Sequence, residues 1–162
     1  MKKLSEPRIT PKDKYTPFQT KNEAYRYLAG FIDGEGCLTI SKQNRGGHHI
    51  SPEYKIKCIV NHTNLDILKV YKNIFGGEIY IVKLKEGRNH KKQHQWIISN
   101  KVAYDFCKKI IKYLILKKKN AQLLIDFYEK RISNKYPIKT EELERREKIL
   151  QEIRVLNKRG IR

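Results

Sequence analysis

The chain is short of acidic residues and lacks long apolar runs. Among its 162 residues, 17 Asp and Glu stand against 36 Lys and Arg, which gives a formal net charge of +19 at pH 7. A surplus of this size favours a polyanionic partner such as nucleic acid. No apolar run approaches the roughly 20 residues that cross a bilayer, and residues 1–19 are polar, so we expect neither a membrane partner nor a signal peptide.

Cysteine and histidine are too few and too scattered to indicate a metal centre of their own. The three cysteines, Cys37, Cys58 and Cys107, are odd in number and lie within apolar patterns, which predicts buried thiols in a reducing compartment. The five histidines have no helical ligand spacing. Lys, Ile, Asn and Tyr are abundant, which is typical of an AT-rich coding genome, so we expect an intracellular protein encoded in a mitochondrion or chloroplast.

The chain is organised around a helix predicted from Lys21 to about Asp33. Thr20 and Glu23 have the spacing of a capping box, in which each side chain accepts a hydrogen bond from the backbone amide of the other. Small and apolar residues recur at spacings of three and four, so they predict one face on which another backbone can approach closely. This face contains Tyr25, Leu28, Ala29 and Ile32, with Gly30 beside them.

An acidic turn is expected after this helix. Gly34 and Gly36 flank Glu35, so the backbone can turn sharply and leave the Glu35 carboxylate at the helix C-terminus. The partial negative charge of a helix C-terminus disfavours a carboxylate unless a cation lies nearby. Carboxylate and carbonyl oxygens suit Mg²⁺, although an ordinary solvated turn is the commoner explanation from spacing alone.

Residues 28–36, LAGFIDGEG, resemble the signature of the LAGLIDADG homing endonucleases. The positions agree except that Phe31, Gly34 and Glu35 stand for Leu, Ala and Asp. The resemblance implies that two such helices pack at a twofold interface and that Glu35 of each binds catalytic metal. Because the chain holds one copy, it also implies a homodimer with an isologous interface. The expected interface residues are Leu28, Ala29, Gly30, Ile32 and Asp33.

The rest of the chain predicts an α+β fold. Alternating residues predict one antiparallel four-stranded sheet with helices on one face, in a single domain over 20–162 after an N-terminal arm over 1–19. The resemblance adds an αββαββα core, a saddle-shaped sheet and extra C-terminal helices. The strands are expected over 37–43, 54–61, 79–85 and 93–99, and helices over 65–75, 100–114, 117–132 and 140–157, with Asn64 and Asn100 as caps. In the third strand, Tyr80, Val82 and Leu84 are expected on one face, with Ile81, Lys83 and Lys85 on the other.

The second face of this sheet is expected to be polar and basic. A solvated face that keeps the protein soluble is the ordinary explanation of such lysines. Here hydrogen-bonding side chains interleave with them, and these can contact base edges while lysines contact phosphates. A twisted ribbon in the major groove of double-stranded DNA is therefore the preferred interpretation. The predicted DNA-binding residues are Thr39, Ser41, Gln43, Arg45, Lys55, Lys57, Lys83, Lys85, Gln93 and Gln95.

The resemblance also implies catalytic residues around Glu35. The carbonyl group of Gly34 would add a metal ligand, and two or three Mg²⁺ ions per dimer are implied. In the family's pattern at the end of the second strand, His62 stands where the family usually has Gln, and either His62 or Asn61 would take the role of its polar residue. Its lysine before a later helix falls on Lys117, with two more lysines directly after it. The predicted catalytic residues are Glu35, Lys117, His62 and Asn61.

These features predict an intron-encoded, site-specific, metal-dependent endonuclease that cuts both DNA strands. It would act as a homodimer on a long, near-palindromic target. The alternative is a non-cleaving nucleic-acid binder, such as an intron splicing cofactor of the maturase type or a DNA-binding regulator, with RNA as a less favoured partner. Glu35 discriminates between them, because a pure binder does not need a carboxylate near phosphates.

Overall fold

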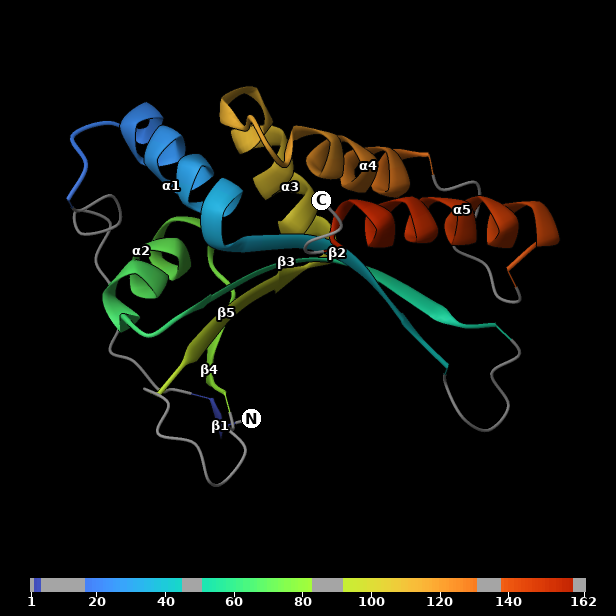
Figure 1. The fold of residues 1–162 in the computed structure, drawn as a ribbon, viewed down its shortest axis with the longest axis horizontal. Coiled ribbons are helices and arrows are strands. Elements are labelled where there is room, and N and C mark those ends of the chain that lie inside the picture. The colour runs from blue at the N-terminus through green and yellow to red at the C-terminus, as the bar shows by residue number, and fades with distance from the viewer. Residues whose placement is uncertain (1, 4–16, 45–50, 83–91, 131–137, 159–162) are drawn as a thin grey trace.

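The computed structural model describes residues 2–3, 17–44, 51–82, 92–130 and 138–158. Helices form one layer over an antiparallel sheet, and the opposite face of the sheet is open and concave (Figure 1). This confirms the predicted α+β fold. The elements in chain order are β1 (Lys2–Lys3), α1 (Lys21–Glu35), β2 (Gly36–Gln43), β3 (Glu53–His62), α2 (Leu65–Phe75), β4 (Glu78–Ile81), β5 (His94–Ser99), α3 (Asn100–Ile110), the short 3₁₀ helix η2 (Ile111–Tyr113), α4 (Lys118–Glu129) and α5 (Thr140–Leu156).

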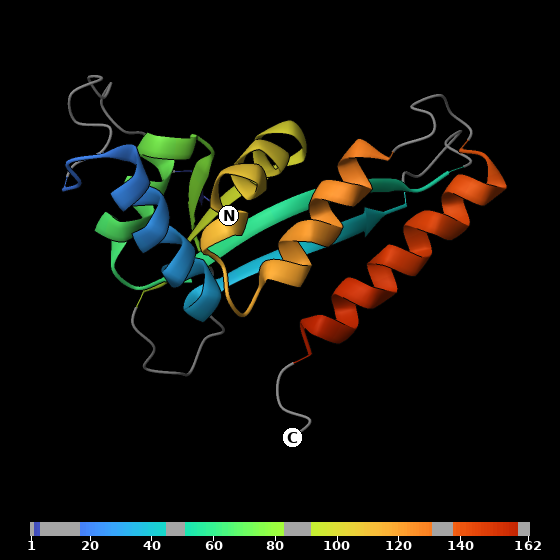
Figure 2. The ribbon, with the colours of Figure 1, turned by 90° about the horizontal axis from the view of Figure 1, so that it is seen from above.

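The sheet has the strand order β1-β4-β5-β3-β2. The four predicted strands form it, and Lys2–Lys3, from the predicted arm, adds a short fifth strand beside β4. Seen from above, α1 and α2 cover one end of the sheet and α5 lies at the other end (Figure 2). Among the described residues, no helix is both long and apolar enough to span a membrane.

Helix α1 begins as the sequence predicts. The Thr20 hydroxyl accepts the Glu23 amide at 3.2 Å, and the Glu23 carboxylate accepts the Thr20 amide at 3.3 Å. The expected sharp turn at Gly34 is wrong, because the helix continues through Glu35 and ends at Gly36, whose backbone is extended. A β-carbon on Gly36 would lie 2.7 Å from the Ile32 side chain and 2.9 Å from its carbonyl oxygen, so only glycine fits this exit from the helix.

The expected alternation is confirmed in β2, β3 and β5. Their inward residues, such as Leu38, Cys58 and Trp96, are buried, and their neighbours along each strand are less so. In β4 the expected phase is wrong by one residue, since Ile79 is buried and Tyr80 lies on the open face. The predicted continuation through Lys83 and Lys85 lies outside the described residues.

Two other expectations need small corrections. Asn100 is the first residue of α3 and not its cap, a place that Ser99 takes, and Asn100 has a positive φ of 50°. The helix stops at Ile110 and the 3₁₀ helix η2 completes the predicted span. Helix α2 has the predicted bounds, with the Asn64 side chain accepting the Asp66 amide at 2.8 Å.

The buried cysteines behave as predicted from their apolar surroundings. Cys58 and Cys107 are free thiols in the core, with their sulfur atoms 3.8 Å apart. Burial raises the pKa of the Cys58 thiol well above its usual value, and the hydrogen bond with Cys107 adds to this effect. The third cysteine, Cys37, is likewise outside any disulfide, but the expectation that it is buried is wrong, since it lies on the open face of β2 and is half-buried.

Candidate active site at the end of helix α1

Two carboxylates lie two residues apart at the C-terminal end of α1, and they have different surroundings. The Asp33 carboxylate accepts the backbone amides of Ile115 at 2.7 Å and Lys117 at 2.9 Å. It therefore joins α1 to the segment before α4. Glu35 is exposed, and among the described residues it forms no ion pair. Of the two, Glu35 is the carboxylate available to a ligand.

The Lys117 ammonium group lies against the same helix end. It donates to the carbonyl oxygen of Ile32 at 2.9 Å and also to that of Asp33. These are carbonyl groups of the last helical turn, where a cation is favourable. Lys117 thus supplies the positive charge expected at this helix terminus. The helix end alone therefore does not require a metal ion.

The structure also separates Lys117 from the two lysines that follow it. Lys119 forms an ion pair with Glu152 of α5 at 2.9 Å, and Lys118 is exposed at the start of α4. Among these three neighbours, Lys117 is the one that contacts the residues of the signature.

Asn61 and His62 reach the same end of the sheet from β3. Gly36 pairs with Val60, so the next residues of β3 lie level with the end of α1. The His62 ring packs edge-on against Phe31 of α1, with centroids 5.5 Å apart. Its Nδ1 accepts the Asn64 amide at 3.0 Å, which places the proton of a neutral His62 ring on Nε2.

Asn61 is exposed on the open face of the sheet. Its side-chain oxygen accepts a hydrogen bond from the Gln95 amide at 2.8 Å. This leaves the Asn61 amino group and the Gln95 oxygen for other partners. The two candidates for the polar position thus point differently, with His62 beside the α1 signature and Asn61 toward the open face.

The donor set at this site fits a hard divalent ion. Glu35 offers an exposed carboxylate, and Lys117 takes the carbonyls of Ile32 and Asp33 but not that of Gly34. Within the described ranges, no three His, Cys, Asp or Glu side chains gather around one point. An ion here would take few ligands from one chain and the rest from water, phosphate or a partner, as Mg²⁺ commonly does.

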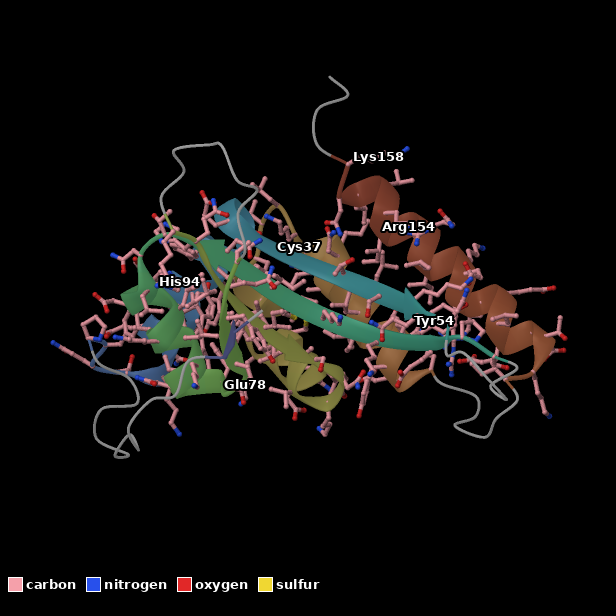
Figure 3. All side chains as sticks on the ribbon, turned by 90° about the horizontal axis from the view of Figure 1, so that it is seen from below. Cys37, Tyr54, Glu78, His94, Arg154 and Lys158 are labelled. Carbon is pink, nitrogen blue, oxygen red and sulfur yellow. The ribbon has the colours of Figure 1, made fainter. Side chains whose placement is uncertain are left out.

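The open face carries the predicted DNA-binding residues that fall in the described ranges. Figure 3 shows the molecule from the side of this face. By the strand register, Thr39 lies beside Lys57 and Ser41 beside Lys55, all on the face opposite the core. Lys55 forms an ion pair with Glu53 at 3.2 Å. Gln93 is exposed just before β5, Gln43 is exposed at the end of β2, and Gln95 lies within β5. Arg45, Lys83 and Lys85 lie outside the described residues.

The predicted DNA-binding set omits several residues of this face, although the alternation had placed Ile59 and Ile97 outward. Tyr80, Ile59 and Ile97 all project to it, and Ile97 with Tyr80 and Lys57 lines a hollow of about 370 Å³. The signal for Ile59 was its outward place in the alternation. The sequence contains no signal for the outward position of Tyr80, because its neighbours Ile79 and Ile81 are apolar too.

The predicted dimer residues do not share one surface. Leu28, Ala29 and Ile32 are 0% exposed and pack in the chain's own core, and Asp33 holds the Ile115–Lys117 segment. Gly30 alone among the five is exposed. The motif's apolar face is turned inward because α1 must cover the sheet of its own chain, so a partner could meet only the opposite face.

Known proteins share this α+β fold, in which a layer of helices covers one face of a saddle-shaped sheet. The homing endonuclease I-CvuI in complex with an I-CreI target is 21% identical, with a TM-score of 0.70 over 87% of this chain and 86% of that one. The archaeal intron-encoded homing endonuclease I-Vdi141I in complex with DNA is 19% identical, with a TM-score of 0.69 over 88% and 89%. Among curated proteins, no match is found.

These structural similarities show the fold, and a sequence model of a protein family shows the family. The model described as LAGLIDADG endonuclease matches residues 28–129, which is more than half of the chain. The chain therefore belongs to the LAGLIDADG endonuclease family. Helix α5 lies beyond the matched residues.

Proposed function

We propose that this chain is a site-specific, divalent-metal-dependent endonuclease that cuts both strands of DNA as a homodimer. The observation that carries this proposal is the position of Glu35, an exposed carboxylate at the edge of an open face lined with lysines and hydrogen-bonding side chains. A binding surface for polyanions gains nothing from a carboxylate there. Family membership and the DNA complexes of the similar structures support the same reaction class.

The residues of this chain have separable roles in the proposed reaction. Glu35 with the Gly34 carbonyl would hold Mg²⁺, which when bound activates water and neutralises charge on the leaving oxygen. Lys117, fixed on the α1 carbonyls, keeps a positive charge near the phosphate. The Nε2 proton of His62 and the amino group of Asn61 are donors that can orient water at the end of β3. The resemblance implies two or three ions per dimer.

The dimer is proposed to form on the outer face of α1. Gly30 and Gly34 lie one turn apart there, no described atom beyond their chain neighbours and the backbone of α1 lies within 4 Å of their β-carbon positions, and Tyr27 beside them is 54% exposed. Ile115 and Leu116 are 85% and 75% exposed, and Asp33 ties their segment to the same helix. Small residues flanked by exposed apolar side chains suit close packing against a second copy. Two half-sites related by a twofold axis imply a long, near-palindromic target.

One observation favours the second candidate, a non-cleaving binder such as a maturase-type splicing cofactor. Lys117 already neutralises the α1 terminus, so the fold is complete without metal at Glu35. Such a protein would bind RNA or DNA through the same basic face. The residue composition supports, for either candidate, an intron-encoded protein of a mitochondrion or chloroplast.

The test compares Glu35→Gln with Glu144→Gln. Glu144 is an exposed glutamate of α5, so its variant makes the same charge change away from the site. We expect Glu35→Gln to bind target DNA and to lose at least about 100-fold in Mg²⁺-dependent cleavage, the scale of removing one electrostatic contact to the transition state. The Glu144→Gln protein should cleave normally. Cleavage by Glu35→Gln at the unmodified rate would reject the metal-binding role, and binding without any cleavage by the natural chain would favour the maturase-type candidate.

A further inference from the structure

An apolar row crosses the open face of the sheet. Cys37 pairs with Ile59, Ile59 with Ile97, and Ile97 with Glu78, which ends the row on β4. Figure 3 shows Cys37 and Glu78 at the two sides of the sheet. The neighbours of Ile59 and Ile97 along their strands are buried on the helical side, so both isoleucines project to the open side, where they are half-buried.

Hydrogen-bonding and basic side chains enclose this row. Toward the α1 end, Asn61 and Gln95 form the amide pair, with Tyr80 next to Gln95. Away from it, the next row contains Lys57 flanked by Thr39 and Ser99. A protein partner of the apolar row would have to cover these polar and positive groups as well, whereas a duplex supplies phosphates and base edges that match them.

In the major groove the apolar group that a base pair presents is the C5-methyl of thymine. We propose that Ile59 and Ile97 bind this methyl group, so each half-site of the target has a thymine at the base pair that faces them. This inference rests on the proposed function, because it names a base in the DNA that the open face would hold. It adds a specificity determinant that lies outside the catalytic residues.

The register also gives the position of this thymine. Residues on one face of a strand recur every two positions, a spacing of about 6.8 Å, which equals about two base pairs of B-DNA. The Asn61 row lies level with the end of α1, and the Ile59 row follows one step outward. The thymine is therefore expected about two base pairs outward from the pair that faces Asn61 and Gln95.

The experiment first selects duplexes by binding and then removes single methyl groups. The full chain, without added metal, retains duplexes from a randomised library, so the selection does not depend on cleavage. Each thymine of the selected duplex is then replaced by deoxyuridine, which lacks only the C5-methyl. We expect one replacement per half-site to weaken binding about fourfold, and both together about fifteenfold, the effect of one buried methyl group at each site. Cytosine at that position should bind more tightly after C5-methylation.

Variants identify the side chains responsible. In Ile59→Ala and Ile97→Ala, we expect the deoxyuridine penalty at that position to shrink or vanish, while Thr39→Ala, one row outward, keeps it. Circular dichroism checks that each variant is folded, and half-buried surface positions make this outcome expected. An equal penalty in the isoleucine variants, or no penalty at any thymine, would overturn the proposal while leaving the endonuclease assignment intact. Enrichment of no sequence at all would overturn both.

Discussion

The helical layer is attached to the sheet by different chemistry at its two ends. Near β4 and β5, the Trp96 ring lies 4.7 Å from Tyr71 and 5.6 Å from Phe106, centroid to centroid, and its indole N–H donates to the Gly76 carbonyl at 2.8 Å. Phe75 meets Phe106 edge-on at 4.6 Å. This aromatic cluster is held by apolar burial, which depends little on pH.

At the other end, α5 contacts the β2–β3 ribbon through charged groups. Glu142 is 1% exposed and accepts hydrogen bonds from Arg145 at 2.8 Å and Arg146 at 2.6 Å. One turn further along, Glu147 accepts from Lys42 of β2 and Tyr54 of β3. This ionic cluster depends on the protonation of two carboxylates, so the two ends should respond differently to substitution and to pH.

Comparing the ends shows how each is matched to its task. The aromatic cluster lies beneath the elements that carry the α1 signature and fixes them by shape. The ionic cluster positions a ribbon whose outer face carries Thr39, Ser41 and Lys55. Charges interact over longer distances than packed surfaces, so small shifts of the ribbon should disturb the ionic cluster less than the aromatic one.

The largest effect is expected from the aromatic end. Trp96→Ala should lower the free energy of unfolding by about 3–5 kcal/mol, because it removes a fully buried ring and leaves a cavity. Since Trp96 is the only tryptophan in the sequence, denaturant unfolding must be followed by circular dichroism and not by indole fluorescence. Trp96→Phe should cost less, as it keeps most of the ring contacts. An unchanged midpoint for Trp96→Ala would contradict the role given to this cluster.

A smaller effect is expected from breaking the ionic end. Arg146→Met removes one partner of the buried Glu142 carboxylate, and Arg145 remains. We expect a loss of about 2 kcal/mol, below the roughly 3–5 kcal/mol for a buried pair that loses its sole partner.

The control for Arg146→Met also replaces the carboxylate. Combining it with Glu142→Leu should recover part of the stability, because the fully buried carboxylate is then gone and the charge that loses its partner is Arg145, whose side chain is 23% exposed. If the double variant lost more unfolding free energy than the two single variants together, the Glu142–Arg146 pair would not be stabilised by charge compensation.

Much of this architecture could be predicted because its signals are local. The capping box of Thr20 and Glu23 and the alternation in β2, β3 and β5 each depend on residues close together in sequence. The phase of β4 could not be predicted, because Ile79, Tyr80 and Ile81 are all apolar and pairing with Trp96 decides which one is buried. The family resemblance indicated Glu35 and Lys117, but it did not predict that Lys117 binds the carbonyl groups of Ile32 and Asp33.

The other features that the sequence did not predict depend on the three-dimensional surroundings of a residue and not on its neighbours in the chain. Asp33 accepts amides from residues more than 80 positions away, which no local pattern records. The buried Glu142–Arg146 pair lies in a helix whose charges suggest solvent on every side. The motif's apolar face likewise predicts that something packs on it, without saying whether this is the chain's own sheet or a second copy.

The smallest effect is expected from pH, and it should distinguish the two ends most directly. Hydrogen bonds from Lys42 and Tyr54 lower the pKa of Glu147. Burial alone would raise the pKa of Glu142, but hydrogen bonds from Arg145 and Arg146 hold it below its usual value. A carboxyl with a lowered pKa in the folded state stabilises above its unfolded pKa of about 4.3, and this stabilisation is lost as pH falls through the folded value.

We therefore expect the unfolding free energy to decrease as pH falls below about 4.5, by an amount that Glu147→Gln reduces. Trp96→Phe should lower stability equally at every pH and leave the slope unchanged, because the aromatic cluster contains no carboxylate. Glu144→Gln controls for the general change in net charge, since Glu144 is exposed. Denaturant unfolding between pH 3 and 7 would measure the slopes, and an identical slope in Glu147→Gln and the unmodified chain would mean that α5 is held to the ribbon by packing, as the aromatic end is.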